Sequence, residues 1–242
     1  LHIPSVKVFG DWDGLQKFLK SKGNPPYSIG GDLFLDTTPV KSLGNLISVG
    51  GTLFLFSTPL KDLGKLKSVG GDLDLWGTKI KSLEDLQTVG GYLDLCKTEI
   101  KSLGNLISVE GDLRLSNSQI ESLGTLQTVS GNLDLENSKL KSLGNLTSVG
   151  GVLDLYGTNI KSLGNLKTVG DYLDLRGTKI KSLGNLTSVG GDLNLRGTKV
   201  KNLENLQFVG GDLLLGNATK VSKEYWKEEL NQTVEVGGDI YL

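Results

Sequence analysis

Leucines and valines recur along the chain with a period of 20 residues, which runs from Gly31 to Gly210 without an insertion or deletion. Nine copies follow one another, and in each the apolar positions are separated by 2, 5, 3, 3, 3 and 4 residues. The second copy has them at Leu53, Leu55, Leu60, Leu63, Leu66 and Val69. A fixed short period predicts a solenoid, in which each repeat is one coil that buries its apolar side only against its neighbours.

Within each coil, the two leucines that are two residues apart fit a short β-strand whose alternate side chains point inward. The following apolar positions, three residues apart, suit a 3₁₀-like or polyproline return path. Glycine pairs such as Gly50-Gly51 are expected to supply backbone freedom at the corner before each strand. Stacked strands then form a parallel sheet that rises by about 4.8 Å per coil.

A small hydroxyl side chain follows the strand in every repeat. Its positions are Thr38, Thr58, Thr78, Thr98, Ser118, Ser138, Thr158, Thr178 and Thr198. We expect these hydroxyls to bond to the backbone of the neighbouring coil, because a buried bend contains polar groups that need a partner.

The two ends depart from the 20-residue period and are expected to cover the terminal coils as caps. At each end an apolar pair is repeated 27 residues on: Val6/Val8 with Leu33/Leu35, and Leu213/Leu215 with Ile240/Leu242. The predicted organisation is an N-terminal cap with a short helix (1–30), nine repeats (31–210), and a C-terminal capping coil with a short helix and a final strand (211–242). Twelve rungs are expected, which corresponds to a rod of about 50–55 Å.

Each cap has room for one helix. Between Asp11 and Lys22 an apolar face is expected, followed by a Gly-Asn-Pro-Pro stop. Its members are Trp12, Leu15, Phe18 and Leu19. Near the other end, Ser222 is expected to cap a helix. That helix carries Tyr225, Trp226 and Leu230.

The string L-x-S-V-G-G-x-L-x-L-x-x-T-x-I-K-S-L-G-N-L, found at 146–166, resembles leucine-rich repeats of an unusually short type. Its S-V-G-G-x-L-x-L portion is also similar to the rungs of receptor L-domains. The resemblance covers 29–215 and departs from the standard repeat in two columns, where Thr or Ser replaces Asn and Gly replaces the first Leu. It implies a binding module in most members, although a fold does not by itself establish a function.

The predicted fold class is therefore a β-rich, leucine-rich-repeat-like solenoid, placed in the α/β class by its helical caps. We expect a parallel sheet of about twelve short strands with 3₁₀ or irregular return segments.

Aromatic residues occupy outward-facing positions in the first three repeats. They are Phe34, Phe54, Phe56 and Trp76. On one sheet face they are expected to form a contiguous apolar patch, which is typical of an interaction site. The alternative is that the N-terminal cap covers them or that they serve self-association. Other variable outward positions complete the candidate partner-binding set: Tyr92, Tyr156, Tyr172, Arg176 and Arg196.

Two columns of like charge follow the repeat. The acidic column consists of Asp74, Asp94, Asp134, Asp154 and Asp174. The basic column consists of Lys41, Lys61, Lys81, Lys101, Lys141, Lys161, Lys181 and Lys201. The repeat from 111 to 130 reverses both, with Arg114 and Glu121. The columns favour solubility and protection against aggregation; the alternative is a Ca²⁺ or cationic-partner site at the aspartates, for which one carboxylate per rung supplies few oxygens.

No catalytic or cofactor-binding pattern is present in the sequence. His2 and Cys96 lie about four rungs apart, about 20 Å, which is too far for a nucleophile and its base. No Cys/His metal pattern occurs, and the glycines recur at coil corners instead of forming one phosphate loop. A net charge of −1, with bases interleaved among acids, argues against nucleic acid. The sequence contains no run of 18 apolar residues, so no membrane insertion is predicted.

We therefore expect a non-catalytic module without a cofactor that binds a protein or peptide through the variable sheet face. The alternative is a structural or surface solenoid that self-associates. A cation- or ice-binding scaffold is less favoured, because ice binding needs two outward Thr columns. The absence of Met at position 1 indicates a processed or excised form, and a secreted or cell-surface location is favoured over a cytoplasmic one.

Overall fold

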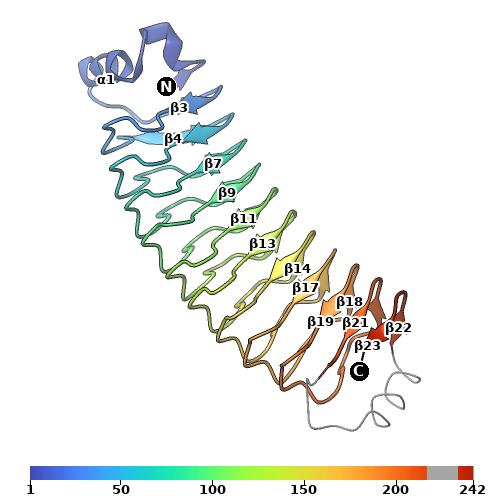
Figure 1. The fold of residues 1–242 in the computed structure, drawn as a ribbon. Helices are drawn as coiled ribbons and strands as arrows, with labels where there is room; N and C mark the ends of the chain where they lie inside the picture. The colour runs from blue at the N-terminus through green and yellow to red at the C-terminus, as the bar shows by residue number, and fades with distance from the viewer. Residues whose placement is uncertain (217–233, 242) are drawn as a thin grey trace.

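The computed structural model describes residues 1–216 and 234–241, and it shows a rod of stacked coils with the N-terminal cap at one end (Figure 1). Each 20-residue repeat makes one turn, and equivalent residues of consecutive repeats pair in parallel, as Leu113 does with Leu133. The chain is therefore a parallel β-solenoid of about nine 20-residue turns, as the period predicts.

Two parallel sheets run the length of the rod. Sheet A has twelve strands. They are β1 (His2–Ile3), β2 (Tyr27–Ile29), β4 (Leu46–Val49), β6 (Ser68–Val69), β8 (Thr88–Val89), β10 (Ser108–Val109), β12 (Thr128–Val129), β14 (Ser148–Val149), β16 (Thr168–Val169), β18 (Ser188–Val189), β20 (Phe208–Val209) and β22 (Glu235–Val236).

Sheet B has eleven strands and contains the leucine pairs. They are β3 (Leu33–Phe34), β5 (Leu53–Phe54), β7 (Leu73–Asp74), β9 (Leu93–Asp94), β11 (Leu113–Arg114), β13 (Leu133–Asp134), β15 (Leu153–Asp154), β17 (Leu173–Asp174), β19 (Leu193–Asn194), β21 (Leu213–Leu214) and β23 (Ile240–Tyr241).

Sheet A corrects the expectation of a single sheet. The end of the return path is extended because its backbone groups pair with the preceding coil, as in the bond from Gly70 N–H to the Val49 carbonyl at 2.9 Å. Ser, Thr and Val suit such a strand. The middle of the return path is irregular, as expected, and in the described repeats it contains no 3₁₀ helix.

The core fills the space between the two sheets. In the second coil, the five leucines are 0% exposed and Val69 is 1% exposed. The same positions are buried in the other repeats, so the core is one continuous column of aliphatic side chains. The spacing of apolar residues therefore identifies the inward positions correctly.

The glycine pairs serve a different purpose from the one expected. Their φ angles are not positive; instead, a Cβ added at Gly170 would lie 1.9 Å from the carbonyl oxygen of Gly150 in the preceding coil. Close approach of neighbouring backbones is therefore what favours glycine here. Glu110 and Ser130 occupy the same column in two coils, so this preference is strong without being absolute.

The N-terminal cap contains a 3₁₀ helix η1 (Val6–Phe9) and a helix α1 (Trp12–Ser21). Asp11 Oδ1 accepts a hydrogen bond from Gly14 N–H at 2.8 Å and caps α1. Leu15 and Leu19 are buried against the first coil, so the amphipathic face lies where the sequence predicts it.

The register expected at the N-terminal end is wrong. Val6 and Val8 belong to η1, and the first rung pairs Ile3 of β1 with Ile29 of β2. At the other end Leu213 pairs with Ile240, in the predicted 27-residue register.

The expected C-terminal helix, with Ser222, Tyr225, Trp226 and Leu230, lies outside the described residues. Helix α1 is the one α-helix in the described ranges, so the molecule is a β-solenoid and the α/β class is not supported.

The hydroxyl column after sheet B is mostly buried and bonds within its own coil. Thr158 Oγ1, for example, donates to the Leu155 carbonyl at 2.9 Å, whereas a partner in the neighbouring coil was expected. Thr58 and Ser138 are the exceptions, because their buried hydroxyl oxygens have no hydrogen-bond partner in the described chain.

Thr58→Val is expected to raise the free energy of unfolding by about 1 kcal/mol, because it removes a buried hydroxyl that has no partner. Thr158→Val is the matched change five coils further along the same column. It is expected to lower the free energy of unfolding by about 1 kcal/mol, because it removes a buried hydrogen bond. Urea titration followed by circular dichroism measures both. Equal effects of the two changes would contradict the assignment.

Candidate functional site

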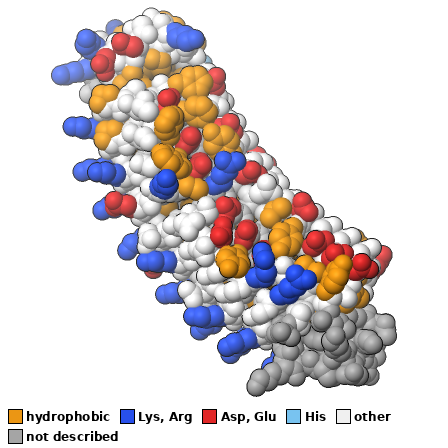
Figure 2. Space-filling view, in the orientation of Figure 1, with side chains coloured by type: hydrophobic (Ala, Val, Ile, Leu, Met, Phe, Trp, Pro, Cys, Tyr) orange, Lys and Arg blue, Asp and Glu red, His pale blue; other side chains and the backbone are white. Residues whose placement is uncertain are grey.

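The variable residues lie on the outward face of sheet B. In the sheet B strands from β3 to β21, a buried leucine precedes and follows the central residue, so the residue between them points away from the core. Figure 2 shows hydrophobic side chains gathered on this face toward the N-terminal end, with acidic side chains beside them. The face therefore divides into an aromatic part and a charged part.

The aromatic patch consists of Phe34, Phe54, Phe56 and Trp76. Phe34 and Phe54 pair across β3 and β5, and their ring centroids lie 5.4 Å apart. Phe56 and Trp76 follow the strands of the second and third coils and are half-buried. Lys97 Nζ lies 4.5 Å from the Trp76 ring centroid, within range of a cation–π contact. The structure thus brings the four predicted aromatics onto adjacent coils.

The N-terminal cap does not cover this patch. Phe34, the member nearest the cap, is 59% exposed. This exposure is large for a phenylalanine, and it answers the alternative that the cap folds over the aromatic residues.

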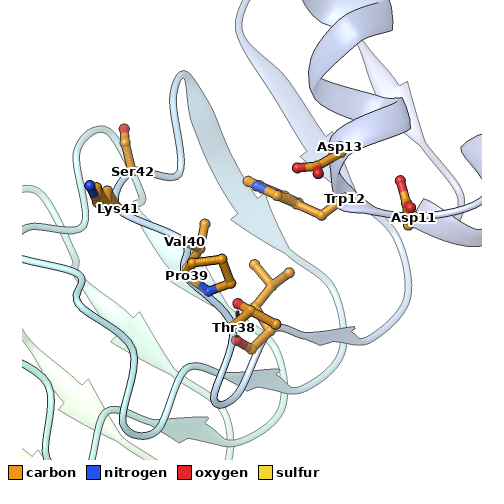
Figure 3. A pocket seen from close by; sticks show the side chains of 9 residues that line it. Asp11, Trp12, Asp13, Thr38, Pro39, Val40, Lys41 and Ser42 are labelled. Carbon is orange, nitrogen blue, oxygen red and sulfur yellow. Dashed lines mark hydrogen bonds between the residues drawn. The ribbon is translucent and has the colours of Figure 1, made fainter.

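Trp12 lines two of the hollows between the cap and the first coil. One, of about 410 Å³, is shown in Figure 3, where the Trp12 ring projects from the start of α1 toward Pro39 and Val40. The other, of about 470 Å³, is lined by Val6, Trp12 and Phe34 among others. The aromatic patch therefore continues into an apolar recess beneath the cap.

Trp12 is the residue that sequence reasoning missed. Its position on the apolar face of the predicted helix indicated a core contact, yet it is only half-buried and lines both hollows. The helical period identifies the face of α1, but not how far the first turn extends beyond the coil that it covers. Only the packed cap shows that this ring borders a recess.

The acidic column has a local structural role that the sequence did not reveal. In each of the five aspartates, Oδ1 accepts a hydrogen bond from the backbone N–H two residues on, at 2.8–3.0 Å. Asn194 accepts the same bond at 3.3 Å in the ninth coil. Aspartate is a poor strand former, but here it stabilises the turn at the strand end.

Burial raises the pKa of the Asp74 and Asp154 carboxyl groups, and neighbouring carboxylates in the column raise it further. The hydrogen bond from the backbone N–H opposes this shift in both. Desolvation is therefore a larger cause of the raised pKa than repulsion between the carboxylates of the column.

The remaining candidates form two separate clusters on the same face. In the first, the Arg114 guanidinium lies 3.9 Å from the carboxylates of Asp94 and Asp112 and 5.6 Å from the Tyr92 ring centroid. In the second, Arg176 pairs with the 1%-exposed Asp174 at 2.5 Å. The hydrogen bond to Asp174 is the main cause that raises the pKa of Arg176.

Aromatic side chains complete the second cluster. The Arg176 guanidinium lies 5.4 Å from the ring centroid of Tyr156, which is 41% exposed. Tyr172 Oη accepts a hydrogen bond from Asn194 Nδ2 at 3.0 Å, and Arg196 is exposed beside it in the next coil. The nine candidate residues therefore divide into the aromatic patch and two clusters in which tyrosine lies beside arginine.

The described residues offer little support for chemistry at this face. Burial raises the pKa of the Cys96 thiol to about 11, so the thiol stays protonated at neutral pH. In residues 1–216 and 234–241, no group of three or more His, Cys, Asp or Glu side chains could hold a metal ion. No helix within those ranges is long and apolar enough to cross a membrane.

Comparison of the chain with protein-family models, with curated proteins and with solved structures finds no match. The functional argument therefore rests on the geometry of this molecule.

Proposed function

We propose that this chain is a non-catalytic protein-interaction module that binds a protein or peptide partner through the N-terminal part of the sheet B face. The observation that carries the proposal is the aromatic patch, in which Phe34 is 59% exposed and its ring lies beside that of Phe54 in a tilted arrangement. Aromatic side chains in a contiguous exposed patch are the residues that most often anchor protein interfaces.

The surroundings of the patch specify the chemistry of the partner. Asp32, Asp36 and Asp74 lie on the outward positions around the aromatic rings, and the Trp12 recess continues the apolar surface. An apolar side chain of the partner would enter the recess, and basic residues beside it would meet the acidic rim. We therefore favour a segment with apolar anchors flanked by lysine or arginine.

The scaffold fits this role as a short-period leucine-rich-repeat type of solenoid. A stack of nearly identical coils holds the outward side chains at fixed spacing, so little conformational entropy is lost on binding. An ice-binding function is less well supported, because the Thr column is mostly buried.

The test compares the wild-type chain with Phe54→Asp/Trp76→Asp as immobilised bait for partner proteins. Loss of two central aromatics is expected to weaken binding of a specific partner by about 100-fold or more. Phe208→Asp is the matched control, because Phe208 is an exposed aromatic on sheet A.

A partner held by wild type and by Phe208→Asp, but lost from the double variant, supports the proposal. Equal capture by all three would contradict it. Concentration-dependent mass that disappears only in the double variant would instead favour the alternative, a solenoid that self-associates through the patch.

A further inference from the structure

Two ladders of opposite charge run along the rod; the lysines are exposed, whereas the aspartates are half-buried and Asp174 is buried. The lysine column comprises Lys41, Lys61, Lys81, Lys101, Lys141, Lys161, Lys181 and Lys201, all of them exposed. Figure 2 shows Lys and Arg side chains along one edge of the rod and acidic side chains mainly on the face beside it. The net charge of −1 conceals this separation.

Both ladders are reversed in the fifth coil, residues 111–130. Arg114 stands in the acidic column, and Glu121 stands between Lys101 and Lys141 in the lysine column. Arg114 relieves repulsion inside its own chain, because it lies 3.9 Å from both Asp94 and Asp112. Such relief requires one reversal per ladder, but it does not require both reversals in the same coil.

We propose that a second copy of this chain docks with its lysine column against the acidic column of the first, with the fifth coil facing the fifth coil. This interface is distinct from the proposed partner-binding site: it uses coils 3 to 7, and it meets the aromatic patch of coils 1 to 3 only at coil 3, where Asp74 and Trp76 lie. It rests on a different observation and can fail or hold independently.

The two columns match because both follow the same coil spacing, about 4.8 Å per step. With the fifth coils aligned, the facing pairs are Asp74/Lys81, Asp94/Lys101, Arg114/Glu121, Asp134/Lys141 and Asp154/Lys161. The charge pattern is symmetric about the fifth coil, so it fixes the level of docking for parallel and antiparallel copies alike.

A shift by one coil destroys the match at its centre. Arg114 would then face Lys101 or Lys141, and Glu121 would face Asp94 or Asp134. Like charges placed opposite each other disfavour a docking arrangement. The two reversals therefore select one alignment among several that a uniform ladder would allow.

The facing lysines are exposed, and the facing aspartates are half-buried, with the side chain of Asp94 14% exposed beside Arg114. In the described chain, the one lysine of the column in an ion pair is Lys81, whose Nζ lies 3.5 Å from Glu99. The backbone bonds of Asp74 and Asp154 use only Oδ1, so the second oxygen can accept an external lysine. Asp174 is excluded, because it is buried against Arg176.

Every copy carries both columns, so the contact is heterologous and can continue from copy to copy. The expected products are dimers and larger assemblies whose mass falls as salt rises, because exposed ion pairs are screened.

The test is sedimentation equilibrium of the full chain at about 20 mM and about 0.5 M NaCl. Arg114→Glu and Glu121→Lys are each expected to weaken self-association by about tenfold, because each places like charges at the centre of the interface. The double variant Arg114→Glu/Glu121→Lys is expected to restore association to within about threefold of wild type, because opposite charges face each other again.

Thermal melting shows whether each variant is folded, and Phe54→Ala/Trp76→Ala, which adds no charge to either column, is expected to associate as wild type does. Salt-sensitive assembly with rescue in the double variant supports the proposal. A monomer at low salt, or two single losses that simply add in the double variant, would overturn it. Loss of mass only in the Phe54→Ala/Trp76→Ala chain would also overturn it, since association would then use the aromatic patch.

Discussion

Leu153→Pro is expected to lower the free energy of unfolding by about 5 kcal/mol or more and to split the rod near its middle. Leu153 is 0% exposed, and its N–H donates to the Tyr172 carbonyl at 2.9 Å. Proline removes that hydrogen bond, at about 3 kcal/mol, and the loss of the leucine side chain adds about 2–5 kcal/mol. Leu133→Pro is expected to act in the same way.

Asn159→Pro is the matched control for this change. Pro39 and Pro59 occupy the equivalent position in the first two coils, and within the described structure Asn159 N–H donates no hydrogen bond. We therefore expect a change of at most about 1 kcal/mol. Urea titration and limited proteolysis measure both variants; a Leu153→Pro chain that unfolds like wild type would show that the coil register is wrong.

Leu15→Ala/Leu19→Ala is the second change with a large expected effect. Both leucines of α1 are at most 2% exposed, and each truncation leaves a cavity worth about 2–5 kcal/mol. Because each element of a solenoid contacts only its neighbours, we expect the cap to open while coils far from it stay folded. The exposed strand edge should then cause aggregation that increases with protein concentration.

Hydrogen exchange followed residue by residue measures this local loss. Amides of α1 and of β2 should exchange rapidly in the double variant, while those of β13 and β15 keep their protection. Lys17→Ala is the control, because Lys17 is exposed on the same helix. Uniform loss of protection along the rod would contradict nearest-neighbour stability.

Some features lay beyond the sequence because they arise from contacts between coils. A two-residue Ser-Val segment is too short to show the alternation of a strand, so sheet A becomes evident only when Val69 and Val89 pair across coils. The bond partner of each Thr, and the backbone N–H held by each Asp, depend on how tightly the chain turns. The hollows beside Trp12 depend on the angle at which the cap meets the first coil.

The sequence by itself determined the coil length, the parallel stacking, the inward positions and the place of α1. It could do so because every coil buries its apolar residues against an identical neighbour, and a strict period therefore translates directly into geometry. Only the tertiary structure decided the second sheet, the first rung and the recess at Trp12. These depend on the path of the backbone around each coil, and a linear period carries no information about that path.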